Sequence, residues 1–317
     1  MSYDPSVFEK IKNEYESRRL KVRTEQEARI NEVREKIEGM AAIDDVLGAT
    51  GIRIMEAIKS GKKEGINGVR AENERLVKER ARLLAAHGYP EDYCDPRYLC
   101  AKCGDTGYAE GRACACMKKA LFEAQAALSG LSGLLKKQSF ENFSTAYYPD
   151  RGEAEQIVSF CQSYAKKGVK EGENLLLMGA TGLGKTHLST SIARVAMEQG
   201  GSVVYESAQN LLSDFEYERF EKDKRDRGPD RSAKYFSADL LIIDALGSEF
   251  SNQFTLSVLY NLLNTRITRG TSTLINTNLS AKELLERYDR RITSRILGEF
   301  TLLTLEGKDI RMQKLGL

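Results

Sequence analysis

The eight residues Gly179–Thr186 read GATGLGKT, and the apolar segment Asn174–Met178 stands directly before them. A segment rich in Thr, Ser, Ala and Ile follows, with the composition of a helix. A strand, a glycine-rich loop, a Lys-Thr pair and a helix in this order make a phosphate-binding loop. The sequence therefore predicts a nucleotide site at the end of a strand.

Each residue type in this loop suits the binding of phosphate. Glycines let the backbone turn so that its N–H groups point inward, and the following helix contributes its positive N-terminal end. Lys185 is expected to reach the β- and γ-phosphates of ATP, and the Thr186 hydroxyl to bind Mg²⁺. We interpret His187, in the first helical turn, as a packing residue rather than a base or metal ligand. The predicted nucleotide-binding segment comprises Gly179, Ala180, Thr181, Gly182, Leu183, Gly184, Lys185, Thr186 and His187.

Strand-like and helix-like segments alternate after the loop. The expected strands are Ser202–Glu206, Asp239–Asp244, Thr273–Asn278 and Phe300–Leu305. Asp244 ends its strand with a carboxylate suited to nucleotide-bound Mg²⁺, and Asn278 ends another with an amide able to orient a water near the γ-phosphate. Such alternation predicts an α/β fold with a doubly wound, largely parallel sheet and the ligand at the carboxyl ends of the strands.

Composition limits the remaining classes. The 317 residues are 41% apolar and 30% charged, an ordinary soluble mixture long enough for two domains. The formal charge of +2 gives no global attraction to nucleic acid, so any such contact needs a local patch. No apolar run approaches the ~20 residues of a membrane span, and the first ten residues are too charged for a signal peptide. We therefore expect a cytoplasmic protein.

The N-terminal part, from about Pro5 to His87, predicts amphipathic helices. Apolar residues such as Ile30, Val33, Ile37 and Met40 recur at spacings of three and four, among many Glu, Lys and Arg residues. Breaks are expected around Gly48–Gly51 and Gly61–Gly68. The helices either pack one stripe and expose the rest to solvent, or present a docking surface for a partner.

Five of the six cysteines lie between Cys94 and Cys116. Cys100 and Cys103 form a knuckle with Gly104, and Cys114 and Cys116 can supply a second pair of thiolates. The C-x-C spacing requires a turn, because an extended strand would point these two side chains apart. Four thiolates favour a structural Zn²⁺ ion, with Cys94 as a spare ligand; free or redox-active thiols are the alternative.

These motifs together resemble an AAA+ ATPase of the bacterial helicase-loader group, the DnaI/DnaC and IstB-like proteins. The resemblance runs from about Tyr89 to the C-terminus and rests on several motifs in register. They are YLCAKCGDTGY from Tyr98, SFENF from Ser139, GATGLGKTHL, DLLIIDALGSE from Asp239, TNL from Thr277, RITSRI from Arg291 and the final GKDIR. The resemblance implies residues 1–137 as a helical, helicase-binding domain ending in a zinc module at about 94–116, and residues 138–317 as an AAA+ P-loop domain.

The resemblance also assigns roles to single residues. It implies that Asp244 closes the Walker B strand and holds magnesium together with Thr186, and that Asn278 is sensor 1. Arg295, with Arg291 as second choice, would be an arginine finger that reaches a neighbouring subunit's γ-phosphate, and Arg311 would be sensor 2. A surface ion pair is the alternative for each arginine. The candidate catalytic residues are Lys185, Asp244, Asn278, Arg295 and Arg311.

One departure from the family pattern affects the expected chemistry. The residue after the Walker B aspartate is acidic in the family and polarises the attacking water, but this chain has Ala245. A methyl group cannot accept a proton, so we expect binding of ATP and Mg²⁺ with slow or defective hydrolysis. Glu249, just beyond the strand, is a candidate substitute.

The resemblance implies an ATP-dependent loader of a hexameric replicative helicase, which self-associates through its ATPase domain and contacts single-stranded DNA. An IstB-like transposase helper is one alternative, and such helpers generally lack a cysteine-rich module. A non-hydrolysing ATP-binding adaptor is the other, and Ala245 keeps it open.

Overall fold

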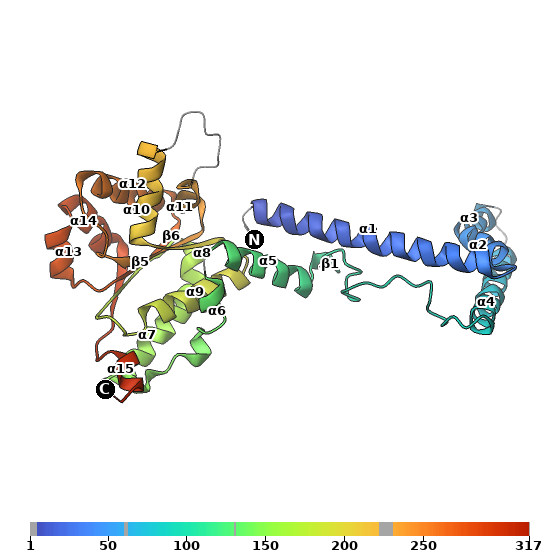
Figure 1. Cartoon of the computed structure of the whole chain (residues 1–317), viewed down its shortest axis with the longest axis horizontal. Coiled ribbons are helices and arrows are strands. Elements are labelled where there is room, and N and C mark those ends of the chain that lie inside the picture. The colour runs from blue at the N-terminus through green and yellow to red at the C-terminus, as the bar shows by residue number, and fades with distance from the viewer. Residues whose placement is uncertain (1–4, 60–62, 130, 222–230, 317) are drawn as a thin grey trace. The chain divides into compact units, whose positions relative to one another are not determined.

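The computed structural model describes residues 5–59, 63–129, 131–221 and 231–316 (Figure 1). The chain divides into two compact units, one of residues 12–114 and one of residues 1–11 together with 115–317. This division falls between Cys114 and Ala115, while a functional division after residue 137 stays a prediction. Within the described ranges, no helix is both long and apolar enough to cross a membrane.

The first part of the chain is helical, as expected. Its elements are α1 (Pro5–Lys36), α2 (Met40–Gly48), α3 (Thr50–Lys59) and α4 (Lys63–Ala86), followed by the short strands β1 (Tyr108–Ala109) and β2 (Arg112–Ala113). The break at Gly48 is confirmed. Of the expected break at Gly61–Gly68, residues 61 and 62 lie outside the described residues. The rest of that prediction is wrong, because α4 begins at Lys63 and runs through Gly68. An unexpected break precedes α2, where Gly39 takes a left-handed conformation with φ of 84°.

The apolar stripe of α1 forms the core of this helical part. Val33, Ile37 and Met40 are buried and pack with Leu84 and Cys94. Polar contacts join α1 to the chain after α4. Gln26 donates a hydrogen bond to the Cys94 carbonyl at 3.0 Å, so the start of the cysteine-rich segment is held against α1.

The second part of the chain is an α/β structure. Before the sheet it has α5 (Ala115–Leu128), α6 (Ser132–Leu135), the short turns η1 (Phe140–Asn142) and η2 (Thr145–Tyr147), α7 (Arg151–Ser163), η3 (Tyr164–Gly168) and α8 (Val169–Glu171). The sheet and its helices then follow as β3 (Asn174–Met178), α9 (Lys185–Glu198), β4 (Val203–Ser207), α10 (Ala208–Glu216), η4 (Tyr217–Glu221), α11 (Ala233–Ser237), β5 (Leu240–Leu246), α12 (Gln253–Arg269), β6 (Ser272–Thr277), α13 (Ala281–Arg287), α14 (Arg290–Glu299), β7 (Phe300–Thr304) and α15 (Ile310–Lys314).

Five parallel strands form one sheet in the order β4-β5-β6-β3-β7. The strand that leads into the phosphate loop, β3, lies between β6 and β7, so it is paired on both sides. Met178, the last residue of β3, stands opposite Thr277 of β6 and Thr304 of β7. The predicted doubly wound parallel sheet is confirmed.

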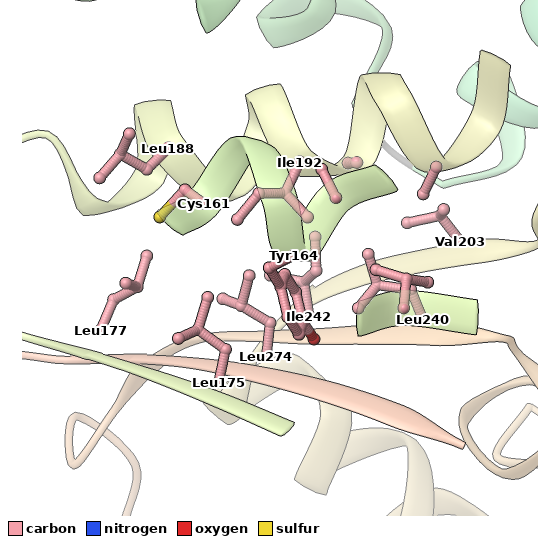
Figure 2. Close-up of a cluster of buried hydrophobic side chains, with 14 of the residues drawn as sticks. Cys161, Tyr164, Leu175, Leu177, Leu188, Ile192, Val203, Leu240, Ile242 and Leu274 are labelled. Carbon is pink, nitrogen blue, oxygen red and sulfur yellow. The ribbon is translucent and has the colours of Figure 1, made fainter. Parts of the chain in front are cut away.

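Helices cover both faces of this sheet, which explains why its strands are apolar without alternation. Leu175, Leu177 and Leu274 point toward the layer that contains α7 and α9, where Figure 2 shows them below Leu188 and Ile192. The side chains between them, such as Leu176 and Ile275, pack on the opposite face with α10, α12 and α14. The loop and strand ends are therefore supported from two sides.

Candidate functional site

A cavity of about 330 Å³ opens at the carboxyl ends of the strands, around the phosphate loop. Parallel α/β sheets bind ligands at this edge. The lining residues are Gln138, Asn142, Phe143, Ser144, Tyr147, Thr181, Gly182, Leu183, Gly184, Lys185, Thr186, His187, Asp244, Ala245, Asn278, Ile310, Arg311 and Lys314. The structure thus brings residues 181–187 of the predicted loop together with Asp244, Asn278 and Arg311 at one cavity. Gly179 and Ala180, also predicted, are not among its described lining residues.

Lys185 is the first residue of α9 and is 7% exposed. Its Nζ donates hydrogen bonds to the carbonyl oxygens of Gly179 at 2.6 Å and Ala180 at 2.8 Å. Burial, opposed by the Asp244 carboxylate and aided by the Arg311 charge, lowers the pKa of Lys185 to about 8. The ammonium group therefore lacks a counter-charge strong enough to offset its burial, and an anionic ligand would supply one.

The charges that line the cavity favour a polyanion. Lys185, Arg311 and Lys314 are cationic side chains, whereas Asp244 is the one carboxylate among the described lining residues. The loop and the start of α9 add backbone N–H groups that point at the same space. A nucleoside triphosphate matches this charge, and the Asp244 carboxylate matches the Mg²⁺ that accompanies it.

Asp244 is held by side chains from both neighbouring strands. Asn276 of β6 donates its Nδ2 to Oδ1 at 2.8 Å, and the Tyr205 hydroxyl of β4 donates to Oδ2. Thr186 Oγ1 lies 3.4 Å from the same Oδ2 atom. The predicted magnesium pair of Thr186 and Asp244 is thus in contact, with Asp244 oriented by two residues that sequence reasoning missed.

Burial and the Asp244 carboxylate raise the pKa of Tyr205, so its hydroxyl stays a hydrogen-bond donor. The signal that could have identified Tyr205 and Asn276 is strand register. Tyr205 stands opposite Ile242, two residues before Asp244, and Asn276 precedes the predicted Asn278 by two residues. Residues two apart in a strand point to the same face of the sheet.

Ala245 lines the cavity, as do Asp244 and Asn278. Its backbone is left-handed, with φ of 55°, and the pairing of β5 with β6 is irregular between Ile243 and Leu246. Residues other than Gly, Asn and Asp adopt this conformation at a cost. Position 245 therefore lines the cavity next to Asp244 in the chain, but its methyl group has no acid-base capacity.

Glu249 is not positioned to replace the missing acid. It is 4% exposed, and its carboxylate accepts hydrogen bonds from the Gly247 amide at 2.8 Å and from the Tyr288 hydroxyl. Arg287 donates to its backbone carbonyl. Glu249 does not belong to the described residues that line the cavity. It ties the turn after β5 to the end of α13.

The linker before the sheet forms one wall of the cavity. The Tyr148 hydroxyl donates to the Leu183 carbonyl at 2.5 Å, and a Cβ atom on Gly184 would press against Phe143. His187 meets Phe143 edge-on with ring centroids 5.1 Å apart. Its Nε2 atom lies 2.9 Å from the Ser139 carbonyl oxygen. His187 therefore both packs against the SFENF segment and lines the cavity.

Arg295 and Arg291 lie apart from this cavity. Both are on α14, where Arg295 Nη1 is 3.9 Å from Glu299 Oε1 and Arg291 Nη2 is 3.0 Å from Asp289 Oδ2. Neither belongs to the lining of the described part of the site. Within one chain they form the surface ion pairs of the alternative interpretation, so a contact with nucleotide would involve another copy.

The cysteine cluster has the geometry of a four-thiolate metal site. The sulfur atoms of Cys100, Cys103, Cys114 and Cys116 lie within 4.8 Å of one another, with Cys100 and Cys114 at 3.9 Å. Four sulfurs at about 2.3 Å from a tetrahedral zinc ion are about 3.8 Å apart, so the residues fit Zn²⁺. The required turn at the C-x-C pair exists because Cys116 lies in the first turn of α5.

Asp105 supports this cluster, whereas Cys94 lies outside it. Asp105 is 1% exposed, and its carboxylate accepts the backbone N–H groups of Leu99 and Cys100, each at 2.8 Å. It thereby shapes the knuckle. Cys94 is outside the cluster in the described part of the chain and packs with the helical core around Val33. The expectation that Cys94 is a spare ligand is therefore not supported by its position.

Comparison with known proteins shows that this chain is similar to ATP-binding proteins. The profile of the IstB-like ATP binding protein family matches residues 124–313. The putative ATP-binding protein of insertion sequence IS232 from Bacillus thuringiensis subsp. berliner is 25% identical over 182 residues, which is 56% of this chain and 69% of that protein. The replicative helicase loader DnaC of Buchnera aphidicola subsp. Acyrthosiphon pisum is 23% identical over 189 residues, 59% of this chain and 75% of that protein.

Two solved structures are also similar. The crystal structure of the DnaC helicase loader has a TM-score of 0.47 at 18% identity and covers 55% of this chain and 99% of its own. The crystal structure of DnaI has a TM-score of 0.45 at 18% identity, with coverage of 56% and 92%. The resemblance drawn from the motifs agrees with the family match and with the two curated relatives.

Proposed function

Because this chain belongs to the IstB-like ATP-binding family, we propose that it is an ATP-controlled loader of a hexameric replicative helicase. The observation that carries this proposal is the four-cysteine cluster in the same chain as the nucleotide cavity. Helpers of the transposase kind generally lack such a module, as noted above. The loader therefore accounts for both sites.

In the proposed function, the phosphate loop holds ATP and the neighbouring strands hold Mg²⁺. Lys185 leaves the carbonyl oxygens of its own loop and binds the β- and γ-phosphates, while Gly179–His187 surround the chain of phosphates. Thr186 and Asp244 bind the magnesium ion. Asn278 and Arg311 face the γ-phosphate, where an amide orients water and a guanidinium stabilises negative charge.

We expect this site to switch the protein rather than to turn over ATP rapidly. Ala245 has no group to polarise a water, and Glu249 is engaged with Gly247 and Tyr288. Slow hydrolysis prolongs the ATP-bound state. If Arg295 of a second copy contacts the γ-phosphate, self-association depends on which nucleotide is bound.

The division of labour follows the proposed domains. Residues 1–137 bind the helicase through the helices and the cysteine module, with zinc as a structural ion that closes the knuckle. Residues 138–317 bind nucleotide, self-associate and contact single-stranded DNA.

The test is co-purification of the full chain with the host's replicative helicase, with Mg²⁺ and either ATP or no nucleotide. We expect a stable complex whose stoichiometry changes with ATP, and no ATP effect for Lys185→Met. Met312→Ala, an exposed change on α15, is the control that should behave as wild type. Absence of a helicase complex under both conditions would reject the loader.

A transposase helper is the second candidate, supported by the relative from IS232, which is as similar to this chain as DnaC. It predicts ATP-dependent binding to double-stranded DNA with a transposase and none to the helicase. The non-hydrolysing adaptor rests on Ala245, and it predicts helicase binding that ATP leaves unchanged.

A further inference from the structure

The chain after β7 returns along the phosphate loop and contacts its backbone at successive points. The Leu305 amide donates to the Met178 carbonyl at 2.8 Å, just before the loop begins. The Ile310 amide donates to the Gly182 carbonyl at 3.1 Å, in the middle of the loop. The segment that leads into α15 is therefore attached directly to the loop.

Asp309 occupies the closest point of this contact. A Cβ atom built on Gly182 would overlap the Asp309 carboxylate, so Asp309 fills the space that a side chain at 182 would need. Gly182 has φ of 82°, which also favours glycine. A glycine in a phosphate loop is usually explained by the approach of phosphate, but here the C-terminal segment also requires it.

The same carboxylate fixes the residue that faces the cavity. Asp309 is the N-cap of α15, and its Oδ1 accepts the Arg311 amide at 2.8 Å. Arg311 lines the cavity, two residues after the capping aspartate. One side chain thus contacts the loop and also sets the backbone from which the guanidinium extends.

We propose that Asp309 is a positioning residue, which holds Arg311 at a set place relative to the phosphate loop of its own chain. The inference rests on the proposed binding of ATP in this cavity and deepens it. Because the segment that carries Arg311 is bound to the phosphate loop of its own chain, Arg311 contacts the γ-phosphate of the nucleotide bound by that same chain. Discrimination between ATP and ADP then depends on the Asp309 cap.

Two simpler roles of Asp309 lead to different results. A cap that only stabilises α15 would affect folding and leave the ATP-to-ADP affinity ratio unchanged. A carboxylate that acts mainly through its negative charge near the phosphates would weaken binding, so its removal by Asp309→Asn would tighten both nucleotides.

The experiment measures the affinities of the full chain for a non-hydrolysable ATP analogue and for ADP, both with Mg²⁺, by calorimetry. We expect Asp309→Ala to weaken the ATP analogue about tenfold, the range for a charge-assisted hydrogen bond, and ADP by less than about threefold. Asp309→Asn keeps the capping oxygen and should restore the wild-type ratio, since Asn and Asp cap equally well. Met312→Ala is the matched control on the same helix.

A double variant separates positioning from an independent contact. Asp309→Ala combined with Arg311→Ala should bind the ATP analogue no more weakly than Arg311→Ala alone, because the cap acts through the arginine. Additive losses, an unchanged affinity ratio in Asp309→Ala, or an Asp309→Asn variant as impaired as Asp309→Ala would each overturn the proposal.

Failure of the proposed function gives a different result. A wild-type protein that binds neither nucleotide contradicts the ATP site itself. A wild-type protein that prefers the ATP analogue, with Asp309→Ala sharing that preference, contradicts only the role of Asp309. Thermal unfolding of every variant identifies any that fail to fold, and Asp309→Asn then carries the test.

Discussion

The nucleotide cavity and the cysteine cluster are built in opposite ways. The cavity lies at the edge of five paired strands with apolar layers on both faces, and its polar groups already contact one another. The cysteine segment has one pair of two-residue strands and is otherwise formed of turns. Two of its residues other than glycine, Asp105 and Glu110, have positive φ angles.

The nucleotide cavity is formed before its ligand binds, whereas the cysteine site needs its metal ion in order to fold fully. The sheet would hold the phosphate loop in place whether or not nucleotide is bound, because the apolar layers on both of its faces support the strand that leads into the loop. The knuckle brings four thiolates together with little apolar burial, and thiolates repel one another unless a cation neutralises them. Structural zinc sites of this kind draw their folding energy from the metal.

Loss of the metal should therefore give the largest and most localised effect. Cys103→Ser or treatment with a strong chelator should remove protection from amide exchange between residues 98 and 116 and leave β3, β5 and β6 protected. Zinc in comparable small sites contributes apparent energies of about 10 kcal/mol or more. Hydrogen-exchange mass spectrometry with zinc quantification measures both quantities.

The control for this prediction is Cys94→Ala. It should lower the stability of the helical core but keep one zinc ion per chain, since Cys94 lies with Val33 and Leu84. Unchanged exchange in the cysteine segment after zinc removal would show that the two sites do not differ as described.

Lys185→Met should break the nucleotide site without unfolding it. We expect nucleotide affinity to fall about a hundredfold, the loss of a charged contact to phosphate. Thermal stability without ligand should rise, because the buried ammonium has a pKa of about 8 and is unfavourable in the folded protein. Calorimetry and thermal unfolding measure the two effects, and a fall in stability would contradict a preformed site.

Tyr205→Phe should weaken magnesium-dependent nucleotide binding about tenfold, as is typical when a partner that orients a metal ligand is lost. The matched control is Tyr288→Phe, which removes a buried hydroxyl from Glu249 instead of Asp244. We expect both variants to lose stability but only Tyr205→Phe to shift the Mg²⁺ titration. Equal shifts would mean that Asp244 needs no orienting donor.

The pH dependence of binding should follow Lys185. Its folded pKa of about 8 lies below the ordinary lysine pKa of 10.5, so the folded protein binds fewer protons than the unfolded chain between these two pH values. The contribution of neutral Lys185 to the free energy of unfolding is present above the unfolded pKa and is lost as the pH falls through 8. Phosphate raises the pKa again, so binding should take up a proton near pH 9 and none near pH 6.5, measured by calorimetry in buffers of different ionisation enthalpy.

The smallest expected effect lies in the backbone at Ala245. Ala245→Gly should raise the free energy of unfolding by about 1 kcal/mol, because glycine adopts positive φ without strain. Ala85→Gly, on the exposed side of α4, should lower it by about the same amount. Denaturant unfolding compares them. A destabilised Ala245→Gly variant would mean that the methyl group contributes packing that offsets the strain.

Much of the α/β part was predictable because its signals are local. Buried parallel strands appear as unbroken apolar runs, and the loop motif needs only neighbouring residues, so β3, β5, β6 and the cavity position followed from the sequence. The turn at the C-x-C pair was also predicted, but the element that forms it was not, because only the structure shows Cys116 in the first turn of α5.

The missed residues depend on contacts between distant segments. Tyr205 and Asn276 reach Asp244 only through strand register, and Asp309 meets Gly182 only because β7 ends beside β3. Arg266 is a further case. It is fully buried, donates to the carbonyls of Tyr235, Ala238 and Ser272, and has the sequence context of a surface helix residue.

The left-handed backbone at Ala245 has a consequence for the strand end that carries Asp244. Its φ of 55° accompanies the irregular pairing of β5 with β6. Aspartate and asparagine adopt positive φ more readily than alanine, so either side chain at position 245 would cost the backbone less strain than the methyl group does. A single substitution there would therefore change the chemistry of the cavity and the folding stability of the chain together.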